Sequence, residues 1–327
     1  MALKYSRVVL SVLVLSVFSN HLTAQERAPE RQQTSQQPSQ DQQEPEQPAR
    51  VVGEPREKAE FDAWQAVERA GRLSEKAELA MRFLESFPNS GLTAFAHHVL
   101  ADAAYQVSEV DNFILHAEQA LLELPEVPQL LAPLAYLYSE RRQTAKASEY
   151  ANRALLLLEN LEKPGKMTAS EWVNQRQGLQ ADAHYALGRA YLELWQQSAG
   201  SPKELRQAVE HFSKTLEMDP EHAYAAFRLG FAHGNSRNPK AAVAAYARAS
   251  ILDSPAAERS KTHLERIHSI MQKARDYEWA GKSIDAILEE ARRRLAAEQA
   301  EKGQELARLA EEIDNLAQED AVLRPDQ

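Results

Sequence analysis

The feature that most constrains this chain is a pattern that recurs with a period of about 34 residues. Ala120 and Ala154 are one period apart, and so are Thr215 and Ala249. The clearest copy runs through Leu229-Gly230, Ala242, Tyr246, Ala249, Leu252 and Pro255. A repeat of this length, with small residues at fixed places, predicts an all-α array of helix–turn–helix units. Each unit leaves an apolar face that only its neighbour covers, so several units have to stack.

The charge balance excludes one large class of partner. The formal net charge is −10, from 38 Lys and Arg against 48 Asp and Glu. The one basic cluster, Arg292-Arg293-Arg294, lies between Glu289-Glu290 and Glu298 and is typical of a solvated helix face. Because binding to nucleic acid phosphates needs clustered Lys and Arg, we expect no nucleic acid partner.

The N-terminal segment over residues 1–24 has the layout of a secretory signal peptide. Lys4 and Arg7 precede an apolar run over residues 8–18, and Ala24 ends a cleavage-like tripeptide. The run is shorter than the about 20 residues that a membrane span requires. We therefore expect cleavage after Ala24, no span thereafter, and export to the periplasm or the medium. The alternative is an uncleaved leader that tethers the protein to a membrane. The chain contains no cysteine, which excludes a lipid anchor on a lipobox cysteine as well as disulfides.

The rest of the chain divides by composition. Residues 25–50 contain nine Gln and four Pro and no Ile, Leu, Val, Met or aromatic residue, so they cannot bury enough apolar surface to order themselves. The predicted organisation is a signal peptide (1–24), a disordered Gln/Pro-rich linker (25–56), a repeat array (57–255), capping helices (256–283), a long charged helix (284–320) and a tail (321–327).

The repeats resemble the tetratricopeptide repeat family, and in particular exported bacterial members of it. The resemblance covers about residues 58–283 and includes the recurring first-helix pairs Leu100-Ala101, Leu134-Ala135, Leu187-Gly188 and Leu229-Gly230. It implies a solenoid of about five helix pairs, in which small residues lie where the two helices of a pair cross.

The fourth unit departs from the ideal length. Ala154 and Thr215 are 61 positions apart, which is 27 more than one period. About 8 of the extra residues lie between the two helices and about 19 precede the unit. Thr168 and Glu171 form a capping-box pattern, and no proline occurs from residue 165 through residue 201. We therefore predict a single long helix over residues 169–197.

The charged C-terminal segment predicts a helix with only a short apolar seam. Leu288, Leu295, Leu309 and Leu316 keep a seven-residue spacing, but Lys occupies position 302. The credible seam from Leu306 to Leu316 is shorter than the three or four heptads that a coiled coil needs. We expect this helix to dock on its own array, or to be solvated, and to cap the repeats.

No pattern for chemistry is present. The ten histidines include no metal-ligand motif, and neither a nucleophile elbow nor a phosphate-binding glycine loop occurs. His97 and His98 are adjacent and are interpreted as ordinary helix residues. We expect no catalytic activity, no cofactor and no metal site.

The family resemblance also implies where a ligand would lie, because the first helix of each pair lines the concave groove. The family's groove positions correspond here to Gln129, Ala132, Tyr136, Asp182, Tyr185, Arg189, Tyr224, Phe227 and Phe231. The Lys and Asn with which some members grip a terminal carboxylate are not reproduced. The candidate partner-binding residues are Tyr136, Tyr185, Arg189, Phe227 and Phe231, which would suit an apolar or helical segment. The alternative is that some of these rings only pack between neighbouring repeats.

The predicted function is a non-catalytic scaffold in the cell envelope that binds a protein or peptide segment in its groove. The alternative is an assembly subunit of an envelope complex, held through the C-terminal helix and the N-terminal arm. The sequence specifies neither the partner nor the oligomeric state.

Overall fold

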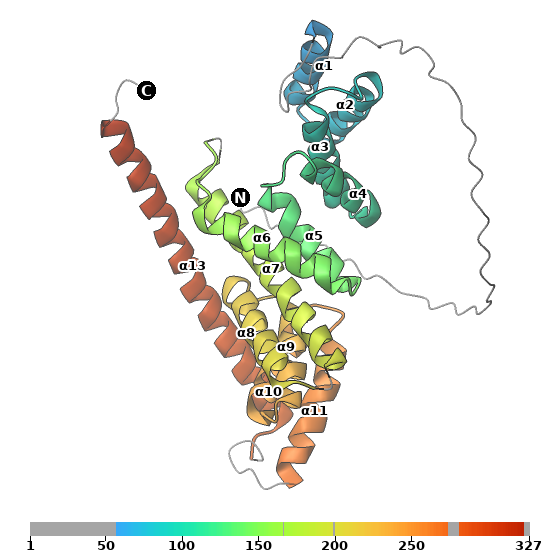
Figure 1. Cartoon of the computed structure of the whole chain (residues 1–327). Helices are drawn as coiled ribbons and strands as arrows, with labels where there is room; N and C mark the ends of the chain where they lie inside the picture. Colours follow the sequence, from blue (N-terminus) through green and yellow to red (C-terminus); the bar gives the residue numbers. More distant parts are fainter. Residues whose placement is uncertain (1–56, 166, 199, 274–280, 324–327) are drawn as a thin grey trace, which may run out of the picture.

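The computed structural model describes residues 57–165, 167–198, 200–273 and 281–323, and within these ranges it contains helices and no strand (Figure 1). This confirms the predicted all-α class. The predicted signal peptide and the whole of the predicted linker lie outside the described residues, as do residues 274–280 between α11 and α13.

Ten helices of the described ranges form five antiparallel pairs, which are units one to five in chain order, as predicted for a tetratricopeptide solenoid. The pairs are α1 (Lys58–Arg69) with α2 (Leu73–Ser86), α3 (Thr93–Gln106) with α4 (Val110–Leu121), α5 (Pro128–Glu140) with α6 (Thr144–Asn160), α7 (Ala169–Gln197) with α8 (Pro202–Met218), and α9 (Ala223–Asn235) with α10 (Pro239–Ile251). Within the described residues, α11 (Ala257–Lys273) and α13 (Ile284–Leu323) follow these pairs.

The core lies along the crossings between paired helices, where the sequence predicted small residues. Ala135 of α5 and Ala151 of α6 are both fully buried. In the next pair, α7 with α8, Gly188 stands at the place of Ala135 and Phe212 stands at the place of Ala151. A Cβ atom on Gly188 would lie 2.7 Å from Cε1 of Phe212, so only glycine lets the helices approach this closely.

Helix α7 has the predicted bounds and the predicted N-terminal cap. The backbone N–H of Glu171 donates to Oγ1 of Thr168 over 3.2 Å, and the backbone N–H of Thr168 donates to Oε2 of Glu171 over 3.0 Å. This reciprocal pair satisfies two donors that the first turn would otherwise leave open. It allows the helix to begin several turns before the region that pairs with α8.

We expect Thr168→Ala to lower the free energy of unfolding by about 1 kcal/mol, because the first turn of α7 loses its capping oxygen. Urea denaturation followed by circular dichroism measures the change. Thr168→Ser keeps the hydroxyl and should stay within about 0.5 kcal/mol of the wild type. Equal losses for the two variants would contradict a capping role.

The C-terminal helix docks on its own array, as expected. Helix α13 packs against α10 and against α7, and Ile287 at its start is 2 % exposed. Glu298 pairs with Arg248 of α10 over 2.7 Å, and the side-chain amide of Gln299 donates to Glu221 before α9 over 2.8 Å. The helix continues to Leu323, three residues beyond the predicted end.

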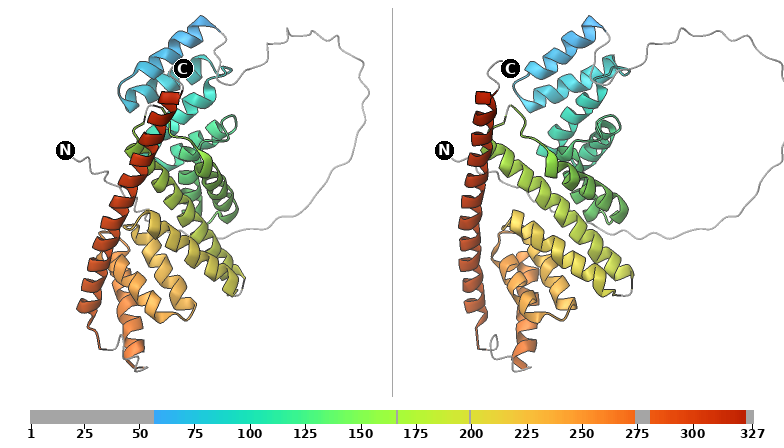
Figure 2. Two further views of the ribbon diagram at one scale, coloured as in Figure 1. Left: turned by 90° about the vertical axis from the view of Figure 1, so that its left-hand side faces the viewer. Right: turned by 60° about the vertical axis from the view of Figure 1, so that its left-hand side comes forward.

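The extra residues at the N-terminal end of α7 provide the second contact surface for α13, after α10. Figure 2 shows α13 running beside the array, so that its first turns lie near α10 and its later turns meet α7. The extra residues of the fourth unit therefore hold the terminal helix in place. Across the residues that the structure describes, no helix has the combined length and apolarity that crossing a bilayer would require.

Candidate functional site

The five residues that the sequence put forward lie on the first helices of three successive units, α5, α7 and α9. Their contacts divide them into two groups. Tyr136, Tyr185 and Arg189 connect units three and four, whereas Phe227 and Phe231 pack both against the cluster that contains Tyr185 and against the cluster that contains Tyr246.

The first group forms a stack of rings between repeats. The ring of Tyr185 lies against Tyr136 with centroids 5.0 Å apart, and against His222 on its other side at 4.6 Å. Tyr185 has no exposed surface, while Tyr136 is half-buried. Burial raises the pKa of both tyrosines above the ordinary value, so both hydroxyls stay protonated.

The carboxylate of Glu140 holds Tyr185 and Arg189 in position. Glu140 at the end of α5 accepts a hydrogen bond from the hydroxyl of Tyr185 over 2.9 Å and one from Nη1 of Arg189 over 2.6 Å. Arg189 also donates to the backbone oxygen of Ser139, and its side chain is 11 % exposed. Tyr185 and Arg189 therefore have their partners within the chain, and their polar atoms serve inter-repeat packing.

The second group is more open to solvent. Phe231 of α9 is half-buried and meets Trp195 of α7 edge-on at 6.1 Å. Phe227 is also half-buried and packs edge-on against Tyr246 and His263. These rings offer rigid apolar area that is only partly used by the chain itself.

Next to Phe227 lies a cation that has no ion pair in the described part of the chain. Arg228 is half-buried beside the ring of Phe227, and its positive charge acts on the hydroxyls of Tyr185 and Tyr246. Its Nε atom is shielded from solvent and has no hydrogen-bond partner, and the guanidinium has no ion pair within the part of the chain that the structure describes. A buried donor without an acceptor costs about 1–3 kcal/mol, which an incoming carboxylate would recover. We call Trp195, Phe227, Arg228 and Phe231 the distal concave patch.

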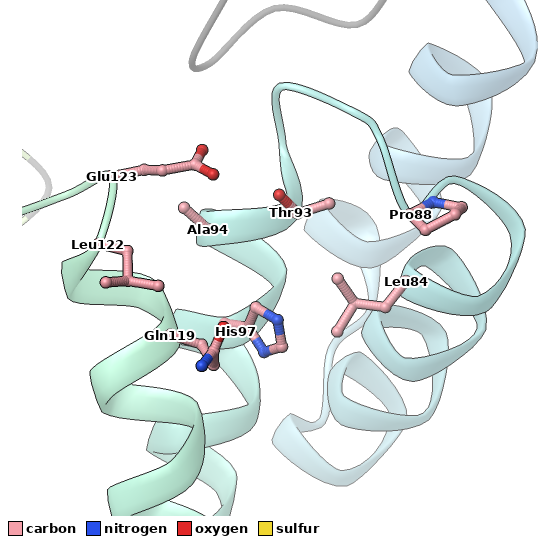
Figure 3. A pocket seen from close by; sticks show the side chains of 8 residues that line it. All are labelled: Leu84, Pro88, Thr93, Ala94, His97, Gln119, Leu122 and Glu123. Atoms are coloured by element: carbon pink, nitrogen blue, oxygen red, sulfur yellow. The ribbon is translucent and has the colours of Figure 1, made fainter. Parts of the chain in front are cut away.

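A small cavity lies far from this patch, between α2, α3 and α4 (Figure 3). Its volume is about 270 Å³, and its wall combines Leu84 and Leu122 with polar groups of His97, Gln119 and Glu123. Pockets for small molecules usually measure about 300–1,000 Å³, so we assign no ligand to it. In the ranges that the structure describes, no three His, Asp or Glu side chains are placed to hold a metal ion together.

The geometry defines the class of protein: a tetratricopeptide-type solenoid of paired helices, with half-buried aromatic residues on α7 and α9. No family model and no curated protein matches the sequence.

Solved tetratricopeptide structures are similar to it in fold. MamA is 16 % identical over 67 % of this chain and 96 % of its own, with a TM-score of 0.39. A thermophilic TPR protein of Thermus thermophilus is 19 % identical over 63 % of this chain and 99 % of its own, with a TM-score of 0.38. PilF of Pseudomonas aeruginosa is 16 % identical over 72 % of this chain and all of its own, with a TM-score of 0.38. At these identities the likeness concerns the fold alone.

Sequence reasoning missed Trp195 and Arg228. Trp195 lies in the part of α7 that the eight extra residues shift out of register with the other repeats, so no family position marks it. Arg228 is adjacent to the predicted Phe227, and it could have been noticed as the only basic residue of α9 before His233.

Proposed function

We propose that this protein is a non-catalytic scaffold of the cell envelope that holds a segment of a partner protein on the distal concave patch. The segment presents an apolar side chain to Trp195 and Phe231 and a carboxylate to Arg228. The carboxylate comes from an Asp or Glu side chain or from the end of the partner chain.

The single observation that carries the proposal is the guanidinium of Arg228, which lies beside the half-buried ring of Phe227 and whose shielded Nε atom has no hydrogen-bond partner. Arginine and aromatic residues are the side chains that most often dominate binding energy at protein interfaces. A charge shielded from water in such a site gains most from a hydrogen-bonded counter-charge. The acidic chain holds many carboxylates, yet none in the described ranges pairs with this group.

The envelope location rests on the sequence of residues 1–24 alone. A positive start, an apolar run of signal-peptide length and a small residue at the end are the pattern that export machineries recognise. Cell fractionation with antibody detection tests it, since an exported protein is recovered with the periplasm or the medium and lacks residues 1–24 in mass spectrometry. Recovery of the full chain with the membrane fraction would favour the tethered alternative.

The binding proposal is tested with the partner recovered by crosslinking in the native host and then purified. We expect Arg228→Gln and Phe231→Ala each to weaken its binding at least about tenfold in calorimetry, because both remove a central anchor. Both variants should keep the circular dichroism spectrum and the melting temperature of the wild type to within a few degrees.

Leu156→Ala supplies the matched control, because Leu156 is 65 % exposed on α6, the second helix of its unit. Its affinity should equal that of the wild type. Unchanged binding by Arg228→Gln and Phe231→Ala would disprove the proposed site, and a weakening by Leu156→Ala alone would move the interface to the outer helices.

A further inference from the structure

Two pairs of histidines occupy the same place in two different repeats. His97 of α3 faces His116 of α4 with their Nδ1 atoms 3.0 Å apart, and His184 of α7 faces His211 of α8 at 3.1 Å. His97 and His184 each stand three residues before the leucine of the recurring first-helix pair, and His116 and His211 each stand four residues before the position of Ala120 and Thr215.

The third unit has no histidine at the two equivalent positions. Leu131 and Tyr150 stand one repeat period after His97 and His116, at the same places on α5 and α6. The apolar Leu131 is fully buried there. The place is thus a packing position between the helices of a pair, and two units fill it with ionisable rings.

Each pair tolerates protons poorly. When both rings are neutral, one Nδ1–H can donate to the other Nδ1, which gives a single hydrogen bond at the observed distance. If the Nδ1 atoms of both rings carried a proton, two N–H groups would face each other at this distance in a half-buried place. The ring centroids are 5.2 Å and 5.3 Å apart, so two positive charges on a pair would repel each other at close range.

The surroundings do not offset such a charge. Burial, and then the neighbouring His116, lower the pKa of His97, and burial lowers the pKa of His116. Burial, followed by His211 and Lys214, lowers the pKa of His184 to about 4, against an opposing effect of Glu210.

Neighbouring charges act in both directions at the second pair, where Glu210 raises and Lys214 lowers the pKa of His184 and of His211. Glu210 is already paired with Lys214 over 2.8 Å, and Tyr191 covers His211 with a parallel ring at 5.5 Å. At the first pair, Glu123 lines the same cavity as His97 (Figure 3). The adjacent His98 approaches Asp102 at 3.7 Å.

We propose that the two histidine pairs make units two and four sensitive to acid. A fall in pH from about 7.5 to 5.5 then loosens these two helix pairs while unit three stays folded. Histidine in the unfolded chain has a pKa near 6.5 and takes up protons across this range. The folded pairs hold lowered values, so the unfolded state binds more protons and stability falls as the pH falls below about 6.5.

The size of the effect follows from proton counting. If each folded pair takes up one proton fewer than the unfolded chain, the unfolding constant rises roughly tenfold per pair for each pH unit below 6.5. For the two pairs together, this is roughly a 100-fold rise between pH 6.5 and 5.5. Carboxylates add a background that is common to the wild type and to histidine variants.

The test replaces the four histidines with the residues that unit three carries at the equivalent positions. A variant with His97→Leu, His116→Tyr, His184→Leu and His211→Tyr carries Leu and Tyr at both places. The unfolding constant of the full chain is measured by chemical denaturation at pH 7.5 and at pH 5.5. The factor by which it rises between these two pH values should be about 100-fold smaller in the variant than in the wild type. The same dependence in both proteins would overturn the proposal.

Hydrogen exchange on the wild type keeps the proposal testable should that variant fold poorly. Protection factors between pH 7.5 and 5.5 should fall by at least tenfold in α3–α4 and α7–α8. They should change little in α5–α6, which contain no histidine. An equal loss in α5–α6, or no loss in α3–α4 and α7–α8, would contradict the assignment.

Discussion

Gly188→Ala is expected to lower the free energy of unfolding by about 1–3 kcal/mol, although alanine is the better helix former. The added Cβ atom would lie 2.7 Å from Cε1 of Phe212, which has no exposed surface. The helices α7 and α8 would have to separate, and the packing along their crossing would be lost. Urea denaturation with circular dichroism measures the loss.

A double-mutant cycle with Phe212→Ala isolates the cause. With that ring removed, the Cβ atom of residue 188 has space, so Gly188→Ala should then raise stability by about 0.5–1 kcal/mol through helix propensity. The sign of the substitution therefore depends on the facing ring. Unit three already carries the alanine version, Ala135 with Ala151, and both side chains are fully buried. A loss of equal size in both backgrounds would contradict the close-crossing explanation.

Ile287→Asp is expected to undock the terminal helix and to lower the free energy of unfolding by at least about 2 kcal/mol. Ile287 is 2 % exposed and belongs to the cluster with Val243, Ala247 and Leu264. An unpaired carboxylate cannot remain in that cluster, so α13 would leave α10 and expose its apolar surface. The melting temperature and the exposure of α13 to limited proteolysis measure the change.

Leu316→Asp is the matched control, because Leu316 is 63 % exposed near the other end of the same helix. It should leave stability within about 0.5 kcal/mol of the wild type. Light scattering on both variants addresses the assembly alternative. A drop in mass for Leu316→Asp alone would show that the end of α13 joins copies or partners, whereas unchanged mass for both agrees with a helix used within its own chain.

The array could be predicted from the sequence because its signals are local. The repeat period predicted the helix pairs, and the capping box of Thr168 with Glu171 predicted the start of α7 at the residue where it begins. The absence of proline through residue 201 predicted that this helix would continue without a break. The short apolar seam of the terminal helix left docking on the array and a solvated helix both open, and its contact with the extension of α7 could not be foreseen from either segment alone.

The site was harder to predict because equivalent repeat positions have different neighbours. Tyr185 and Phe227 occupy the same place in successive units, yet Tyr185 is buried and Phe227 is only half-buried. The difference arises from residues outside the repeat pattern, since His222 covers one face of Tyr185 and Glu140 reaches its hydroxyl. Periodicity assigns a residue to a face of a helix but does not reveal which long-range partner fills the space above it.

The histidine pairs were also missed, although a sequence signal for them exists. His116 follows His97 by 19 positions and His211 follows His184 by 27, and the difference equals the eight extra residues between the helices of unit four. Correcting each unit for its insertion before comparing positions would have aligned the two pairs.

Site-specific photocrosslinking in the native host tests the central claim, that a partner protein docks on the distal concave patch, most directly. A photoreactive phenylalanine derivative replaces Phe231 in one variant and the exposed Leu156 of α6 in another. We predict a defined partner crosslinked at position 231 and not at position 156, and loss of that product when Arg228→Gln is added. A product at position 156 alone, or one at position 231 that is unaffected by Arg228→Gln, would contradict the proposed docking site.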